Sequence, residues 1–202
     1  KEVNSGSCSH DTINIWRKEE VLKVTIHEVI HLLNYDLKNV DTILKEVYKK
    51  KYNVTSDRIN IYEAYTEIWA NLINIYLIIK DETTIKKSLK LFSQYIEYEK
   101  FFVNYQACKI FFITGLCDKV IDIDKHTNIL PYYIIRNEIF SDLRKFLNYC
   151  KEKNSNYIKL NGNLNNFLFD SKKCKKNNRL FTNSKKTSII YNTTRMTSIE
   201  LN

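Results

Sequence analysis

The sequence predicts a mainly helical domain of the α+β class that carries one small sheet. Its 202 residues include three glycines and one proline, which is too few for a turn-rich β protein. Apolar residues recur at helical spacing along several segments, and 44% of the chain is hydrophobic, enough to bury a core. We therefore expect residues 1–202 to form a single domain.

The first elements follow from periodicity. Residues 11–16 alternate between polar and apolar side chains, which predicts a short strand. Residues 19–33 begin with two glutamates and then present a broad apolar surface, as a helix does. We expect an amphipathic helix over residues 40–51 and a largely apolar helix over residues 60–79. The strand should therefore run directly into the first helix.

The second half of the chain is also predicted to be helical. Residues 83–102 and 104–117 are rich in phenylalanine and tyrosine and predict two core helices. Residues 118–130 are polar and turn-like, and residues 132–149 return to helical periodicity. We expect a final short helix over residues 193–201.

The run HEVIH at residues 27–31 carries the clearest chemical signal. On a helix His27 and His31 share one face, so both imidazoles reach one metal ion while Glu28 reaches its bound water. The alternative is a buried helix with two hydrogen-bonded histidines. That arrangement is costly without a metal or donors beside the rings. The motif thus predicts two zinc ligands and a general base.

A catalytic zinc site normally has three protein ligands and an open position. Glu63 and Glu67 lie four residues apart on the helix predicted over residues 60–79, so they share a face. We assign Glu63 as the third ligand and Glu67 as the carboxylate that orients a histidine. The reverse assignment and a pair of solvated glutamates remain open.

These motifs resemble a known class of enzymes. His27-Glu28-x-x-His31 followed by Glu63-x-x-x-Glu67 resembles the gluzincin zinc peptidases, although their pattern often has aspartate where this chain has Glu67. Longer runs are similar to metallopeptidases of large DNA viruses. These runs are Asn4-Ser5-Gly6, Ile15-Trp16-Arg17-Lys18-Glu19-Glu20, Glu63-Ala64-Tyr65-Thr66-Glu67-Ile68-Trp69-Ala70, Pro131-Tyr132-Tyr133-Ile134-Ile135-Arg136 and Arg195-Met196-Thr197.

The resemblance implies a zincin-like helical domain whose small sheet offers an edge strand beside the HExxH helix. In this chain the edge would lie between Ser5 and Ile15 and would pair with the backbone of a protein or peptide substrate. An ordinary hairpin packed on the core is the alternative. The implied function is a zinc-dependent metallopeptidase, a hydrolase that cleaves peptide bonds through a zinc-activated water with Glu28 as general base.

The reaction also needs a hydrogen-bond donor for the developing oxyanion. Tyr132, Tyr133 and Arg136 follow the one proline of the chain, and His126 lies six residues before Tyr132. We rank Tyr133 and Arg136 first, partly because of the resemblance. The predicted site therefore contains His27, His31 and Glu63 as Zn²⁺ ligands, with Glu28, Tyr133 and Arg136 as catalytic residues and Glu67 behind the ligands.

The net charge of +9 is concentrated near the C-terminus. Residues 151–202 contain 11 lysines and arginines against 3 acidic residues, whereas residues 1–150 contain 21 against 20. We expect a basic C-terminal region with a mobile loop over residues 170–187. A second function is an inactive, zinc-stabilised domain that contacts nucleic acid or an acidic protein through this region. A solvated loop explains the charge more simply, because no base-stacking motif accompanies it.

Cysteine usage and hydropathy suggest a location. Five cysteines form an odd set without paired spacing, which favours a reducing compartment. The longest apolar stretch, residues 68–79, is too short to span a bilayer and predicts a core helix. The sequence starts without methionine and lacks a secretory leader, so we expect a fragment or processed form. The prediction is a cytoplasmic viral protein, with association with viral particles left open.

Overall fold

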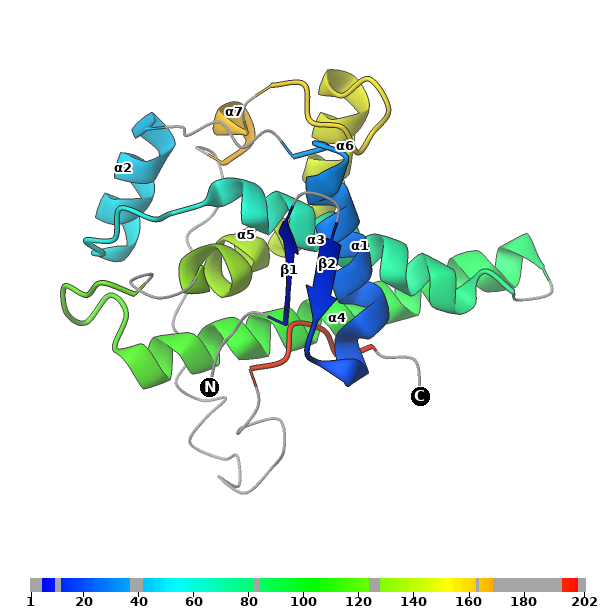
Figure 1. Cartoon of the computed structure of the whole chain (residues 1–202), viewed down its shortest axis with the longest axis horizontal. Helices are drawn as coiled ribbons and strands as arrows, with labels where there is room; N and C mark the ends of the chain where they lie inside the picture. Colours follow the sequence, from blue (N-terminus) through cyan, green and yellow to red (C-terminus); the bar gives the residue numbers. More distant parts are fainter. Residues whose placement is uncertain are drawn as a thin grey trace.

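The computed structural model describes residues 5–9, 12–36, 42–81, 84–123, 128–162, 164–168 and 194–199. In these stretches the protein is mainly helical and has one two-stranded antiparallel sheet (Figure 1). This confirms the predicted fold class, a mainly helical protein with a small sheet. The predicted loop at residues 170–187 and the basic residues within it lie outside the described residues.

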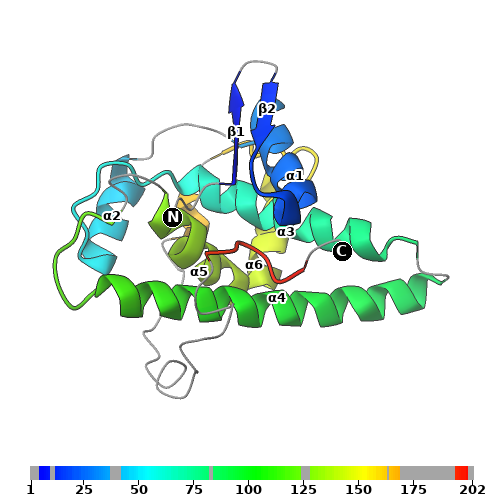
Figure 2. The same ribbon diagram turned by 60° about the horizontal axis from the view of Figure 1, so that its bottom comes forward.

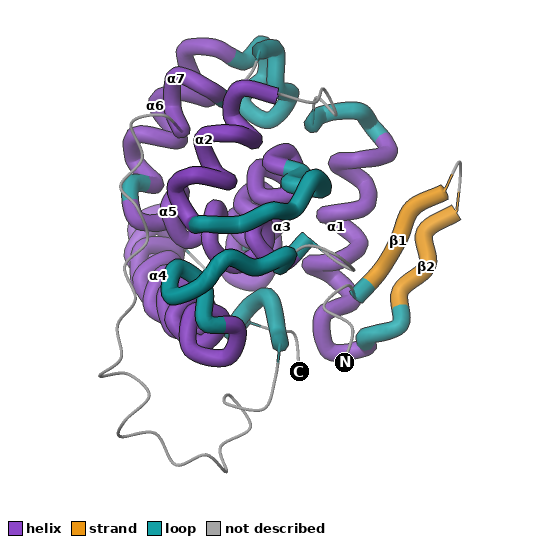
Figure 3. Tube along the Cα trace, turned by 90° about the vertical axis from the view of Figure 1, so that its left-hand side faces the viewer, coloured by secondary structure: helices purple, strands orange, loops and turns teal. Residues whose placement is uncertain are grey.

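Strands β1 (Gly6–Ser9) and β2 (Thr12–Ile15) form the sheet, and β2 matches the strand predicted over residues 11–16. The hairpin lies along the outer side of helix α1 (Figure 3). Gly6 is required at this contact, because a Cβ atom on it would lie 2.5 Å from Cγ1 of Val24 on α1. The absence of a side chain lets the β1 backbone approach the helix.

Helix α1 (Val21–Leu32) follows a short 3₁₀ turn, η1 (Lys18–Glu20), and packs against α3 (Ile61–Ile79). Every residue of α3 from Glu63 to Leu72 is buried, so polar side chains on this helix face protein rather than water. Helix α3 is therefore a core helix, as predicted. Within the described residues, no helix is both long and apolar enough to cross a membrane.

Helix α4 (Ile85–Thr114) is one continuous helix, so the prediction of two helices over residues 83–102 and 104–117 is wrong. The segment contains no glycine or proline, and Val103, at the expected break, is fully buried. The helix ends at Gly115, whose φ of 69° lies in the left-handed region that suits a helix terminus. Figure 2 shows α4 extending across the whole molecule.

Three further segments contribute buried side chains to the core. Helix α2 (Thr42–Tyr52) agrees with the helix predicted over residues 40–51, whose first two positions lie outside the described residues. A π-helical turn, η2 (Leu130–Ile135), leads into α5 (Arg136–Ser141). Both η2 and α5 pack against α3. The helical periodicity predicted over residues 132–149 agrees with the structure, in which the helical turns are interrupted at Asp142, where the backbone leaves helical geometry.

Helices α6 (Leu143–Lys153) and α7 (Asn165–Leu168) complete the described helices. Residues 194–199 have no regular secondary structure, so the final helix predicted over residues 193–201 is wrong within this range. These six residues lie between helices, where side chains bind their main-chain groups. Such bonds replace the internal bonds that a helix would have made.

Candidate metal centre

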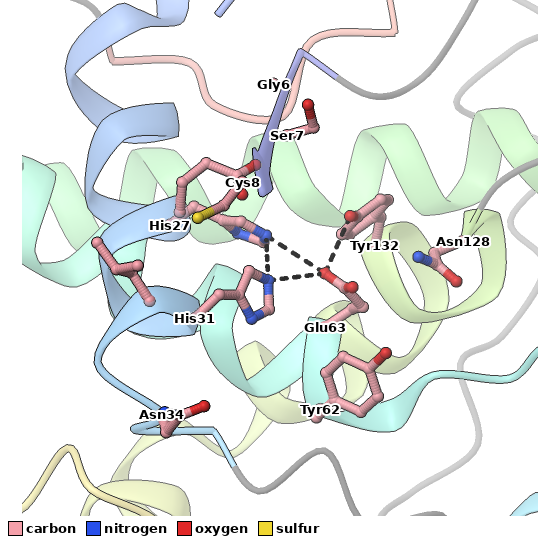
Figure 4. A pocket seen from close by; sticks show the side chains of 12 residues that line it. Gly6, Ser7, Cys8, His27, His31, Asn34, Tyr62, Glu63, Asn128 and Tyr132 are labelled. Atoms are coloured by element: carbon pink, nitrogen blue, oxygen red, sulfur yellow. Dashed lines mark hydrogen bonds and ion pairs between the residues drawn. The ribbon is translucent and has the colours of Figure 1, made fainter. Parts of the chain in front are cut away.

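His27 and His31 lie on the face of α1 that packs against α3, as their spacing predicts. Both side chains are buried, and their Nε2 atoms are 3.0 Å apart. Glu63, in the first turn of α3, places its Oε2 atom 3.3 Å from each of these nitrogens. Figure 4 shows the three side chains converging on one point. His27, His31 and Glu63 thus form a group that could hold a metal ion.

The other ring nitrogens identify which atoms face that point. His31 Nδ1 lies 2.6 Å from Asp36 Oδ2, and His27 Nδ1 lies 2.9 Å from Glu67 Oε2, the second contact at an angle short of good hydrogen-bond geometry. An ionised carboxylate only accepts hydrogen bonds, so each Nδ1 carries the proton. In its neutral form, which is the form that binds a metal, each imidazole therefore directs the lone pair of Nε2 toward the other histidine and Glu63.

These three acceptor atoms match the requirements of a metal ion. Ligand atoms around a tetrahedral zinc ion lie about 2.0–2.1 Å from the metal and hence about 3.3–3.4 Å from one another. The observed separations of 3.0, 3.3 and 3.3 Å are close to that spacing. In the described part of the chain no lysine or arginine pairs with Glu63, so a cation would balance the cluster.

The pKa values of His31 and Glu63 are both shifted by contacts within the cluster. Burial lowers the pKa of His31, but hydrogen bonds with Asp36 and Glu63 outweigh it and raise this pKa to about 10. Burial raises the pKa of Glu63, and the two histidines more than reverse that effect and hold it well below its usual range. Both shifts mean that the cluster favours a positive charge at its centre.

Asp36 is a site residue that the sequence analysis missed. It is buried a few residues beyond the end of α1, where Asn34 adopts a left-handed φ of 53° and Tyr35 N–H donates to Ile30 O. This turn directs Asp36 back to His31. An aspartate shortly after the second histidine of the motif was the available signal.

Glu67 lies one turn further along α3 and is surrounded by positive charge. Its Oε1 atom accepts from Lys23 Nζ at 2.6 Å and from Arg136 Nη1 at 3.0 Å. Burial raises the pKa of Glu67, but Lys23, His27 and Arg136 reverse this and hold it well below its usual range. Glu67 is thus an ionised carboxylate whose charge is already balanced, and it faces Nδ1 of His27.

Glu28 faces a cavity of about 440 Å³ that also reaches the two histidines and Glu63. Desolvation raises the pKa of its carboxyl group. Other cavity-lining residues come from β1, α1, α3 and η2 and from the segments between elements. They are Gly6, Ser7, Cys8, Leu32, Asn34, Tyr62, Asn128 and Tyr132. The carboxylate, the histidines and an open space of substrate size therefore lie together.

The structure separates the residues considered as oxyanion donors. Tyr132 lines the cavity, and its hydroxyl donates to Glu63 Oε2 at 3.0 Å (Figure 4). The hydroxyl of Tyr133 donates to the Thr194 carbonyl instead, and the fully buried Arg136 pairs with Glu67. Neither of these two side chains lines the cavity. His126 lies outside the described residues.

Comparisons with known proteins give one distant viral relative. The chain is 27% identical over 103 residues to the uncharacterised protein R210 of Acanthamoeba polyphaga mimivirus. The match covers 48% of this chain and 26% of the relative, so the chain spans about a quarter of that protein's length. No protein-family model and no solved structure matches the chain. The similarity is therefore to a viral protein, without a family assignment.

Proposed function

We propose that this protein is a zinc-dependent metallopeptidase in which His27, His31 and Glu63 bind the metal and Glu28 is the general base. The observation that carries the proposal is the convergence of three acceptor atoms beside Glu28 in one cavity. Two imidazoles and one carboxylate are a donor set of catalytic zinc sites, which leave a fourth position open. Among the described residues no hydrogen bond or ion pair engages the Glu28 carboxylate, and its place beside the open position favours an enzyme over an inactive zinc domain.

Zinc held by His27, His31 and Glu63 would lower the pKa of a water molecule toward neutrality and would polarise the carbonyl group of a substrate. Glu28 takes the proton of the attacking water at its carboxylate and passes it to the leaving amine. Its raised pKa suits this second step, because a buried carboxyl group holds a proton more readily. Tyr132, rather than Tyr133, is the donor that faces the cavity and the developing oxyanion.

The proposed substrate is an extended segment of a protein or peptide. Strand β1 lines the cavity through Gly6, Ser7 and Cys8, and in the described residues it pairs with β2 alone. Its other edge therefore offers main-chain donors and acceptors to a substrate backbone. A peptide held there lies beside Glu28 and the metal ligands. The proposed site of action is the cytoplasm.

The test compares the wild type with Glu28→Gln by metal analysis and by digestion of a peptide library. We expect one equivalent of zinc in both proteins, with kcat lower by roughly 10²–10⁴-fold in the variant, because the amide cannot accept the proton. Glu97→Gln is the matched control, since Glu97 is exposed on α4. A wild type without zinc would refute the proposal, and zinc without cleavage would favour the inactive binding domain.

A further inference from the structure

Residues 194–199 run between α3, α4 and α5 (Figure 2), and none of them lines the cavity of about 440 Å³. Side chains from several elements bind them. The bonds join Tyr133 to Thr194 O at 2.7 Å, Gln106 to Arg195 O at 3.1 Å, Asn74 to Ile199 O at 3.2 Å, and Glu99 to Thr197 Oγ1 at 3.0 Å and Ser198 N at 2.9 Å. The segment is thus held in one register.

Met196 connects two parts of the metal centre through its main chain. Its N–H donates to Glu20 Oε1 at 2.7 Å, and Glu20 is the residue that immediately precedes α1. Its carbonyl oxygen accepts from Nη1 of Arg136. The same nitrogen donates to Glu67 Oε1, and the other oxygen of Glu67 faces His27. A closed circuit therefore runs from the start of α1 through Met196, α5 and α3 and returns to α1.

The circuit is buried at each of its members. Glu20, Glu67, Arg136 and Met196 are each at most 4% exposed, so water does not replace a lost contact there. Glu20 has further partners just before β1 and just after β2, because its Oε2 atom accepts from Ser5 Oγ at 2.8 Å and from Arg17 Nη1 at 3.0 Å. A shift of Met196 thus moves the start of α1 relative to Arg136 and Glu67.

We propose that residues 194–199 are a positioning element of the metal centre, in which the Met196 main chain fixes Glu20 and Arg136 and thereby holds Glu67 against His27. The inference rests on the proposed zinc site and assigns a part in it to a segment that does not line the cavity of about 440 Å³. A partner that orients a ligating histidine typically changes metal affinity by roughly 10–100-fold. Met196 acts on such a partner through Arg136, so the lower end of that range applies.

The decisive variant is Met196→Pro, because proline has no N–H to donate to Glu20. We expect the zinc dissociation constant, measured by competition with a chromogenic chelator, to rise about tenfold. The absorption spectrum of the Co²⁺-loaded protein should shift as well, because the His27 ring is no longer held in place. Met196→Leu is the matched control, since it keeps the main-chain groups and nearly the same buried volume. Its affinity and spectrum should be those of the wild type.

Glu20→Gln provides a second test if Met196→Pro does not fold. Its amide replaces one of the two carboxylate oxygens, so Met196 N–H or the Ser5 and Arg17 pair loses its acceptor. We expect a rise of about threefold in the zinc dissociation constant, at the low end of the effect of an outer partner. If the folded variants bind zinc like the wild type and give the same Co²⁺ spectrum, the positioning role is overturned. A wild type that binds no zinc would instead overturn the proposed function itself.

Discussion

Glu63 and Glu67 lie one turn apart on α3 and face the same helix, but their surroundings differ in charge. The carboxylate of Glu63 meets the Nε2 atoms of His27 and His31 and opens to the large cavity. That of Glu67 meets an ammonium and a guanidinium group and borders a small cavity of about 30 Å³. One glutamate has a place for an added cation, and the other already has its cations.

This difference assigns the two residues. A carboxylate with balanced charge gains little from a metal ion, whereas Glu63, which pairs with no lysine or arginine in the described residues and converges with two imidazole nitrogens, gains much. Glu63 is therefore the proposed ligand, and Glu67 is the proposed partner of a ligand. Because Lys23 and Arg136 are buried beside Glu67, this residue also balances the charges of an ammonium and a guanidinium group, which Glu63 does not. A substitution of Glu63 should consequently lower zinc affinity more than one of Glu67, and a substitution of Glu67 should lower stability more than one of Glu63.

The largest expected effect on zinc is that of Glu63→Ala. Loss of a direct ligand should raise the zinc dissociation constant more than the roughly 10–100-fold of an outer partner. In the presence of a chelator, its free energy of unfolding in urea should change less than that of Glu67→Gln. Glu97→Ala, on the exposed face of α4, is the control. Tighter zinc binding by Glu63→Ala than by Glu67→Gln would reverse the assignment.

Glu67→Gln should weaken zinc binding by roughly 10–100-fold and should also destabilise the metal-free protein. A neutral amide leaves Lys23 and Arg136 without their counter-charge in a buried site, which costs about 3–5 kcal/mol. Urea denaturation with and without zinc separates the two effects. Unchanged stability in the chelator would mean that the two cations find other partners, and the comparison between the glutamates would then fail.

The part of this centre that local spacing determines was predictable from sequence. Residues four apart on a helix share a face, so His27 and His31 were placed together, as were Glu63 and Glu67. The partners of Glu67 were not predictable, since Lys23 comes from α1 and Arg136 from α5, far apart in the chain. Charge pairs of this kind depend on how helices pack, which a single sequence does not reveal.

The choice between two adjacent tyrosines shows the same limit. Tyr132 and Tyr133 are equivalent in sequence, but successive residues of a helical turn point in different directions. The packing of η2 against α3 turns Tyr132 to the cavity and Tyr133 to residue 194. The fold class followed from composition, whereas the unbroken α4 and the irregular segment 194–199 depended on tertiary contacts.

The smallest expected effect is that of Asp36→Asn, and its dependence on pH tests the outer shell of the centre. In the metal-free protein Asp36 helps to raise the pKa of His31 to about 10, so zinc must displace a proton from His31 at neutral pH. Without the carboxylate this pKa falls toward the usual value of about 6.5. Protons then compete less with zinc for His31 in the variant than in the wild type. The lost orientation of His31 weakens zinc binding by the variant about tenfold, but weaker competition from protons offsets this loss at every pH below the His31 pKa of the wild type. Relative to the wild type, the variant should therefore bind zinc better at pH 6.5 than at pH 8.5, because displacing the proton from His31 of the wild type becomes harder as the pH falls. Zinc titrations at both pH values measure this, with Asp57→Asn as the control at an exposed ion pair with Lys49. If the ratio of the variant's zinc affinity to that of the wild type is the same at both pH values, Asp36 does not set the proton affinity of His31.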